Sequence, residues 1–138
     1  MVKVILDSNF LLVPFQFRID IFEELNNLLG KAEPIILSTT IEELKKMAEK
    51  SSTKKRMQFS AALKLAERCE ILEVEKEASE SYDDVILRVA RELKIPVGTN
   101  DMELRKRLRR AGIATIYLRQ KSRLVIEGNI FKNTFLPC

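Results

Sequence analysis

The chain has 138 residues, with 24 Lys and Arg against 20 Asp and Glu, two Cys, and neither His nor Trp. A chain of this length can bury an apolar core as one domain without a disulfide or a structural metal. The lack of His excludes Ser-His-Asp and Cys-His triads, histidine general bases and metal sites built on imidazole. Any catalysis must therefore use carboxylates, lysines, hydroxyls or backbone amides.

Charge, cysteine spacing and hydropathy indicate the compartment. The net charge of +4 and the isoelectric point near 9.1 are only mildly basic, so a nucleic-acid surface needs local clusters of Lys and Arg. Cys69 and Cys138 belong to no C-x-x-C pair, which fits a reducing compartment. The sequence shows no signal-peptide pattern and no apolar run near the roughly 18 residues of a membrane span. We expect a cytoplasmic protein that does not bind membranes.

Short apolar runs typical of buried strands alternate with segments of helical periodicity. The runs cover residues 2–6, 35–37, 71–74, 95–97 and 113–118. Apolar side chains recur at helical spacing between them, with two such segments between the second and third runs. This alternation predicts right-handed βαβ crossovers and an α/β fold, with a parallel sheet of about five strands covered by helices.

Nothing in the sequence marks a domain boundary, so we expect residues 1–138 to form a single domain. The polar stretch 50–56 is typical of a solvated turn between two helices. Near the C-terminus, Gly128-Asn129 separates two short apolar segments and favours a small hairpin. Residues 121–138 are therefore expected to form a C-terminal extension or a small hairpin.

Acidic residues recur where the predicted strands give way to helices. The four are Asp7, Glu43, Asp83 and Asp101, one for each of the first four predicted strands. Each has an ordinary structural explanation, because Asp is a good N-cap and acids are favoured in the first turn of a helix. The Thr-x-x-Glu spacing before Glu42 and Glu43 likewise matches two overlapping capping boxes. At Asp101, the neighbouring Thr or Asn is an alternative cap.

Taken together, the four carboxylates indicate a site. In a parallel βαβ fold every strand-to-helix junction lies at the carboxyl edge of the sheet, so all four would share one crevice. They would repel one another unless a cation lay among them, and ligation by oxygen alone suits Mg²⁺ or Mn²⁺. Without His or a reactive Cys, such a site is best suited to metal-assisted attack of water on a phosphodiester.

The same motifs resemble those of PIN-domain nucleases, in the same order and spacing over residues 1–120. They are Val-Ile-Leu-Asp-Ser-Asn at 4–9, the Glu43 helix, Asp-Asp-Val-Ile at 83–86 and Thr-Asn-Asp at 99–101. Segments 81–90 and 97–108 are most similar to archaeal PIN proteins related to the eukaryotic small-subunit rRNA-processing nucleases. VapC-type toxins are more distant relatives.

The resemblance implies a three-layer α/β/α sandwich with sheet order 3-2-1-4-5 and a Mg²⁺- or Mn²⁺-dependent endoribonuclease that acts on single-stranded RNA. Matched position by position, it implies that one acidic quartet is catalytic and holds one or two metal ions: Asp7, Glu43, Asp83 and Asp101. It implies polar supporting roles for three further residues, Asn9, Thr99 and Asn100. It also favours a homodimer.

The resemblance also bears on two neighbouring acids. It adds Asp84 as a further metal ligand through water. It aligns Glu43 rather than Glu42 with the family's acid, and a shift of one residue would turn the carboxylate by about 100° around the helix.

A run of cations, Leu-Arg-Lys-Arg-Leu-Arg-Arg at 104–110, follows the last acid. Helical spacing places Arg105 and Arg109 on one face, with Lys106 and Arg110 beside them, and this face could bind a phosphate backbone. The alternative is a solvated helix whose late cations complement the helix dipole, with Glu103 pairing to Arg107.

The resemblance to PIN-domain nucleases implies a metal-dependent endoribonuclease that acts in rRNA processing, with RNA and a ribosome-assembly factor as partners. Two alternatives stay open. One is a non-catalytic RNA-binding PIN scaffold protein, and the other is a VapC-type toxin ribonuclease paired with an antitoxin. A haloacid-dehalogenase phosphatase is excluded, because its second Asp would stand where this chain has Asn9.

Overall fold

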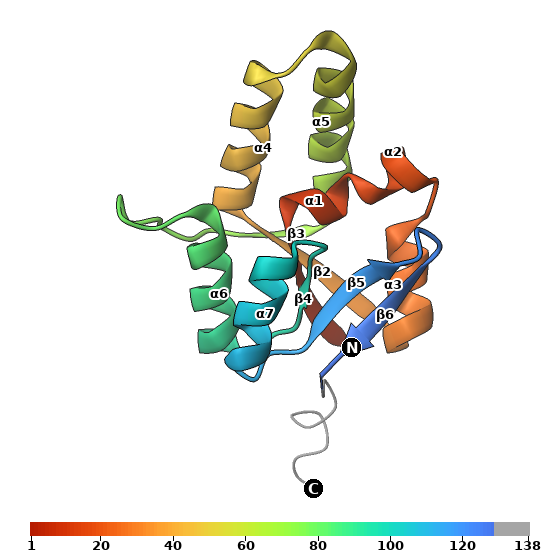
Figure 1. Cartoon of the computed structure of the whole chain (residues 1–138), viewed down its shortest axis with the longest axis vertical. Helices are drawn as coiled ribbons and strands as arrows, with labels where there is room; N and C mark the ends of the chain where they lie inside the picture. Colours follow the sequence, from red (N-terminus) through yellow and green to blue (C-terminus); the bar gives the residue numbers. More distant parts are fainter. Residues whose placement is uncertain (129–138) are drawn as a thin grey trace, which may run out of the picture.

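The computed structural model describes residues 1–128, which form a six-stranded sheet covered by helices (Figure 1). The strands are β1 (Val2–Leu6), β2 (Ala32–Leu37), β3 (Glu70–Leu72), β4 (Val97–Gly98), β5 (Thr115–Arg119) and β6 (Arg123–Glu127). Their order is β3-β2-β1-β4-β5-β6, with β1 to β5 parallel and β6 antiparallel to β5. The predicted order 3-2-1-4-5 is confirmed, and β6 adds a sixth strand.

Helices follow the strands in the alternation that the sequence predicts. They are α1 (Ser8–Leu11), α2 (Val13–Phe17), α3 (Ile21–Leu29), α4 (Ser38–Lys50), α5 (Thr53–Ala66), α6 (Tyr82–Leu93) and α7 (Met102–Arg110). None of the helices in residues 1–128 is long and apolar enough to cross a membrane.

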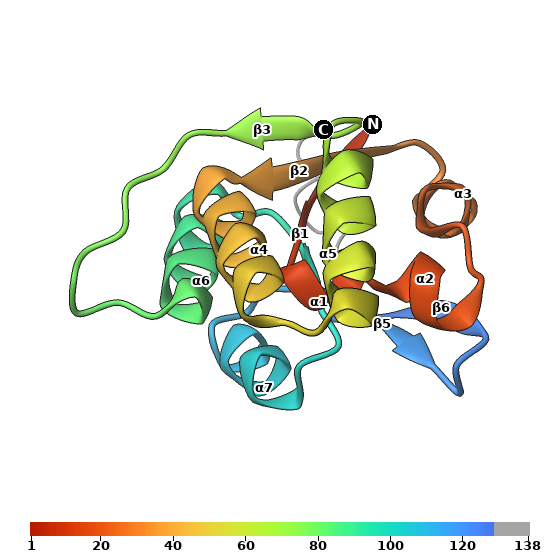
Figure 2. The same ribbon diagram turned by 90° about the horizontal axis from the view of Figure 1, so that it is seen from above.

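Two apolar cores, one on each face of the sheet, make this fold a three-layer α/β/α sandwich. In β1 the side chains of Val4 and Leu6 pack against α1 to α5, whereas Ile5 packs against α6 and α7. All three are fully buried, because β1 lies in the middle of the sheet with helices on both sides (Figure 2). This explains why the strand is a continuous apolar run rather than an alternating one.

The pair of helices expected between the second and third strands is present as α4 and α5. These two helices lie side by side and project away from the sheet (Figure 1). In the described residues, Leu37 occupies the N-cap position of α4 and makes no side-chain capping bond. The two predicted capping boxes are therefore wrong, because Thr39 and Thr40 lie inside the first turn.

Gly98 allows the ends of β1 and β4 to pack closely. A Cβ at this position would lie 3.0 Å from Leu6 Cδ2 and 3.2 Å from Phe10 Cε2. Both neighbours are fully buried, so neither can move aside easily. Close packing at this point brings the segments that follow β1 and β4 together at the carboxyl edge of the sheet.

The described C-terminal strand belongs to a hairpin that differs from the one predicted. β6 pairs with β5, and the turn between them contains Gln120 and Lys121 at φ values of 54° and 59°. Gly or Asn usually marks such a turn, so the sequence carries no signal for it. The predicted hairpin at Gly128-Asn129 requires residues from Asn129 onward, which lie outside the described residues.

Candidate functional site

Asp7 lies where the carboxyl ends of β1 and β4 meet. Its backbone N–H donates to the Gly98 carbonyl at 2.9 Å, and only 2% of the residue is exposed. Its Oδ1 accepts a 2.8 Å bond from the Ser8 N–H. Its Oδ2 accepts 2.8 Å bonds from Thr99 Oγ1 and Asn9 Nδ2. Three donors therefore fix the orientation of this carboxylate.

The polar residues predicted to support the acids form one network, but not all of them point toward the acids. Asn9 Oδ1 accepts a 2.9 Å bond from the Asn100 N–H. Asn100 Oδ1 accepts a 2.7 Å bond from the Leu118 N–H, so this side chain ties the loop after β4 to β5. Asn9 and Thr99 thus orient Asp7 directly, whereas Asn100 holds the backbone that carries Thr99.

Asp101 caps α7 and stands beside Thr99. Its Oδ1 accepts from the N–H groups of Glu103 at 2.9 Å and Leu104 at 3.1 Å, and its own N–H donates to Thr99 Oγ1 at 3.1 Å. Asp101 itself, rather than Thr99 or Asn100, is therefore the cap. Both capping bonds use Oδ1, so a second role for Oδ2 is compatible with capping.

Glu43 and Asp83 reach the same place from α4 and α6. Burial raises the pKa of Glu43 to about 7, and the charge of Asp7 and then that of Asp83 add to the effect. Burial also raises the pKa of Asp83 to about 6, with further contributions from Asp7 and Asp101. The pKa of Asp7 is raised as well, mainly by burial. The charges of Asp7 and Asp83 act on Glu43, and those of Asp7 and Asp101 act on Asp83, so the four predicted acids lie near one another.

The two acids next in sequence have other partners. Glu42 Oε2 accepts a 3.2 Å bond from the Tyr82 hydroxyl. Asp84 Oδ1 accepts a 2.7 Å bond from Arg107 and its Oδ2 a 2.9 Å bond from the Ser81 N–H. These contacts lower the pKa of Asp84, with the Ser81 backbone as the largest cause. The geometry therefore gathers Glu43 rather than Glu42 into the cluster and commits Asp84 to structural contacts.

The donor set suits a hard divalent cation. One oxygen of Glu43, Oε1, is buried and has no hydrogen-bond partner within residues 1–128. All ligands on offer are carboxylate oxygens, which Mg²⁺ and Mn²⁺ prefer. Within residues 1–128 no group of three or more Asp, Glu or Cys side chains is placed so that it could hold a metal ion together. Mg²⁺ commonly binds through one or two carboxylates and keeps several waters.

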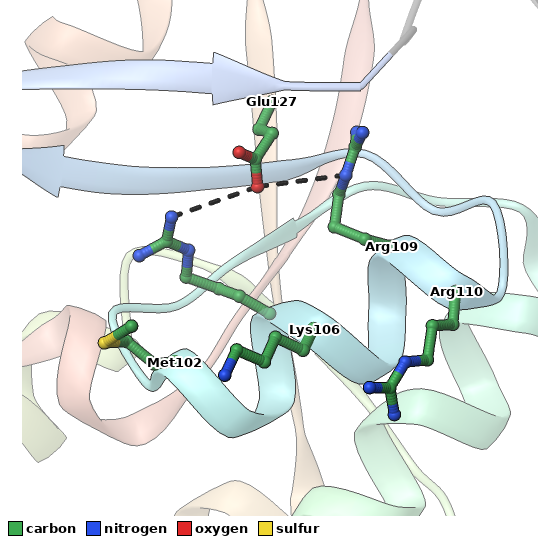
Figure 3. A pocket seen from close by; sticks show the side chains of 6 residues that line it. Met102, Lys106, Arg109, Arg110 and Glu127 are labelled. Atoms are coloured by element: carbon green, nitrogen blue, oxygen red, sulfur yellow. Dashed lines mark ion pairs between the residues drawn. The ribbon is translucent and has the colours of Figure 1, made fainter.

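The predicted basic face of α7 lines a pocket of about 440 Å³ against β6 (Figure 3). Arg105 and Arg109 face Glu127, with nitrogen-to-Oε1 distances of 3.9 Å and 3.8 Å. Lys106 and Arg110 point away from Glu127 in this view. Only one of the lining side chains is acidic against four cations, so the pocket is positive and open to an anion.

Two contacts of α7 differ from what the sequence indicates, since one was not predicted and the other was predicted with the wrong partner. Arg105 stacks on the Tyr117 ring, with 3.4 Å between the guanidinium carbon and the ring centroid. The predicted pair between Glu103 and Arg107 is wrong: Arg107 binds Asp84, and the partner of Glu103 in the described residues is Lys106 at 4.0 Å. Arg107 pairs with Asp84 because the Ser81 N–H already holds the Asp84 carboxylate in place, whereas the Glu103 side chain is exposed.

Sequence comparisons connect this chain to a described family. A sequence model of that family, described as PIN like domain, matches residues 4–121. Ribonuclease VapC4 of Methanocaldococcus jannaschii is 32% identical over 132 residues, which cover 94% of this chain and 100% of the relative. Ribonuclease VapC9 of Archaeoglobus fulgidus is 27% identical over 123 residues, which cover 89% of this chain and 87% of the relative.

Solved structures share the same fold. The structure of the PIN domain endonuclease Utp24 superposes with a TM-score of 0.76 at 29% identity, covering 93% of this chain and 92% of that one. VapBC2 from Rickettsia felis, solved with a DNA fragment from its promoter, superposes with a TM-score of 0.64 and covers 86% of this chain and 100% of that one. At 18% identity, the second likeness is one of fold alone.

Proposed function

Because the chain belongs to the PIN-like domain family, we propose that it is a metal-dependent endoribonuclease that hydrolyses phosphodiester bonds of single-stranded RNA. The observation that carries this proposal is that Asp7 and Asp101, the N-caps of α1 and α7, meet through the Thr99 hydroxyl, with Glu43 of α4 and Asp83 of α6 close enough for their charges to interact. Folding such mutually repelling groups together costs stability, and a metal site offsets that cost. The similarity to two ribonucleases and to an endonuclease supports the same conclusion.

Asp7, Glu43, Asp83 and Asp101 are the residues that would hold one or two Mg²⁺ or Mn²⁺ ions. The chemistry that such a cation supplies when bound is a water ligand of lowered pKa and neutralisation of charge on the phosphate. Asn9 and Thr99 keep Asp7 in one orientation through their 2.8 Å bonds to Oδ2.

Arg107 has a role at the edge of this site. It is paired with Asp84 at 2.7 Å, and its positive charge lowers the pKa of Asp83 against the stronger opposing effects. Arg107 therefore favours the charged form of Asp83, the form that binds a cation. Asp84 keeps Arg107 in that position, so it supports the site without being one of the four direct ligands.

The basic pocket on α7 provides the binding surface for RNA. Asp101 begins α7, so cations on this helix start within one turn of the acidic cluster. Arg105 and Arg109 share the Glu127 carboxylate, whereas Lys106 contacts only the exposed Glu103 at 4.0 Å, so Lys106 and Arg110 are the cations most available to phosphates. A positive surface beside a negative one would hold the RNA backbone on both sides of the cut.

Two biological roles fit this chemistry, and different relatives favour each. The likeness to Utp24, at 29% identity, supports a role in rRNA processing with a ribosome-assembly factor as partner. The likeness to VapC4, at 32% identity over 94% of the chain, supports a toxin ribonuclease with an antitoxin partner. Induced expression separates them: arrest of growth with loss of translation indicates the toxin, and accumulation of rRNA precursors on deletion indicates processing. In either role we expect a homodimer.

The nuclease itself is tested with labelled single-stranded RNA and Mn²⁺, with an EDTA control. Asp7→Asn should abolish cleavage. Asp20→Asn is the control, because Asp20 also occupies the N-cap position of a helix, α3, away from the cluster, and Asn caps a helix equally well. RNA binding without metal-dependent cleavage by the wild type would contradict the proposal and favour a non-catalytic scaffold.

A further inference from the structure

A second polar pocket lies on the α4 side of the acidic cluster. It has a volume of about 390 Å³ and is lined by side chains of α4 and of the loop between β3 and α6: Ser38, Thr39, Glu42, Lys46, Val74 and Lys76. Glu42, which precedes Glu43, lines the pocket, and Tyr82, which precedes Asp83, contacts its two lysines. Two residues at this pocket are therefore neighbours in sequence of proposed metal ligands, one on α4 and one on α6.

Two cations of this pocket lie against the aromatic ring of Tyr82. The ammonium nitrogens of Lys46 and Lys76 lie 5.6 Å and 5.4 Å from the ring centroid. The Tyr82 hydroxyl donates a 3.2 Å bond to Glu42 Oε2, which holds the hydroxyl end of the ring against α4. The ring, two ammonium groups and a polar wall thus come together from α4, α6 and the loop.

The loop that carries Lys76 is anchored on both sides of that residue. Before it, Ser38 Oγ donates to the Val74 carbonyl at 3.1 Å and accepts from the Val74 N–H at 2.9 Å. After it, Arg88 binds the Glu80 carboxylate at 2.9 Å, and it also reaches back to the Glu75 carbonyl at 2.7 Å. The pocket is therefore formed before any ligand arrives.

One lining residue has an unused hydrogen-bonding group. Thr39 is 6% exposed, and its hydroxyl has no hydrogen-bond partner within residues 1–128. A buried polar group without a partner is uncommon and calls for an explanation such as a bound ligand or water. This observation is independent of the lysines and of the ring.

We infer that this pocket is a nucleotide subsite, where one base of the bound RNA stacks on Tyr82 and its phosphate pairs with Lys46 and Lys76. The inference rests on the proposed ribonuclease function and extends it to the substrate contacts on the α4 side. The contact of an exposed lysine with an aromatic ring is weaker than base stacking. A base that binds Tyr82 can therefore displace a lysine ammonium group from the ring, and that group can then pair with the phosphate of the same nucleotide. Stacking tolerates any base, because every base has a π face.

The two pockets then receive the RNA on either side of the acidic cluster. α4 and the loop before α6 line the pocket at Tyr82, whereas α7 and β6 line the basic pocket of Arg105, Lys106, Arg109 and Arg110. Figure 2 shows α4 and α6 beside each other and α7 next to them. RNA bound to both would pass over the four carboxylates. This arrangement makes Tyr82 a substrate-binding residue on the opposite side of the cut from α7.

The test uses a short single-stranded RNA containing 2-aminopurine, in EDTA so that no cleavage occurs. Stacking on Tyr82 should quench the fluorescence of the bound base in the wild type and in Tyr82→Phe. Tyr82→Ala should abolish the quenching and raise Kd about tenfold. Lys46→Ala/Lys76→Ala should lower the slope of log Kd against log salt by about 0.7 for each phosphate that the variant no longer neutralises.

Lys3→Ala/Lys31→Ala is the matched control, because it removes the same charge from exposed positions at the amino edge of the sheet. It should leave the quenching unchanged. Equal quenching in the wild type and Tyr82→Ala would overturn the inference, as would equal salt slopes for the two double variants. If Tyr82→Ala does not fold, the loss of quenching in Tyr82→Leu and the salt slope of Lys46→Ala/Lys76→Ala test the inference in its place. If the wild type quenches the fluorescence but shows no Mn²⁺-dependent cleavage, the subsite is upheld and the nuclease function is contradicted. If the wild type cleaves RNA but the Tyr82 variants bind and quench like the wild type, the nuclease function is upheld and the subsite is contradicted.

Discussion

The Thr99 hydroxyl donates a 2.8 Å hydrogen bond to Asp7 Oδ2 across 92 residues of sequence, and both residues are buried. Burial raises the pKa of Asp7, and this bond is the strongest influence in the opposite direction. Thr99 therefore favours the charged form of this buried carboxylate.

We expect Thr99→Val to destabilise the fold by about 2 kcal/mol, the usual cost when a buried charged group loses a hydrogen bond. The same change should also reduce cleavage, because Asp7 is left with two of its three donors. Urea denaturation and single-turnover kinetics measure the two effects. The matched control is Thr115→Val: Thr115 is equally buried, but its hydroxyl has no hydrogen-bond partner in the described residues. Equal effects in the two variants would show that Thr99 acts only through packing.

The metal-free protein should become less stable as the pH rises from 5 to 8. The pKa of Glu43 is raised from 4.5 to about 7 and that of Asp83 from 3.8 to about 6, so both carboxyls bind protons more tightly folded than unfolded. Protonation therefore stabilises the fold, and this stability is lost as each group ionises near its folded pKa. After allowance for solvent screening, the loss is on the order of 1 kcal/mol for each group.

Urea denaturation in EDTA across this pH range measures that loss. Glu43→Gln should flatten the curve above about pH 6, because the carboxyl whose pKa is about 7 no longer titrates. Glu49→Gln, on the exposed side of the same helix, should leave the curve unchanged. Stability that rises with pH over this range would contradict the proposed repulsion at the site.

Mg²⁺ or Mn²⁺ should raise the melting temperature of the wild type. A ligand at about a hundred times its Kd stabilises a protein by about 2.7 kcal/mol. Asp83→Asn should be more stable than the wild type in EDTA at pH 7.5, because repulsion with Asp7 and Asp101 is relieved. The same variant should show a smaller rise in melting temperature when metal is added. Thermal melts with and without metal measure both, and Asp20→Asn is the control. An unchanged metal shift in Asp83→Asn would remove it from the proposed ligand set.

Lys106→Ala/Arg110→Ala should weaken RNA binding at the α7 pocket without changing the fold. Each cation that neutralises a phosphate contributes about 0.7 to the slope of log Kd against log salt for a single strand, so the slope should fall by about 1.4. Binding titrations at several salt concentrations measure it, with Lys3→Ala/Lys31→Ala as the control. A parallel shift of affinity at constant slope would mean that these two side chains do not contact phosphates.

The alternation of strands and helices, and the edge at which the acids gather, follow from local features of the chain. Apolar periodicity is a local property and predicts the strands, the helices and the parallel sheet, whereas the order 3-2-1-4-5 came from the resemblance to PIN-domain nucleases. Asp7 and Asp101 follow their strands directly, which places them at the carboxyl edge whatever the packing of the helices. Their capping roles are also local, because an N-cap bonds only to the next few residues.

Which side chains face one another depends on how the helices pack against the sheet. Glu43 joins the acidic cluster and Glu42 meets Tyr82 because the rotation of α4 against the sheet separates two adjacent side chains by about 100°. The pairing of Arg107 with Asp84 likewise depends on how α7 packs beside α6. Such rotations result from the summed burial of many side chains on two faces of the sheet, which no short segment of sequence contains.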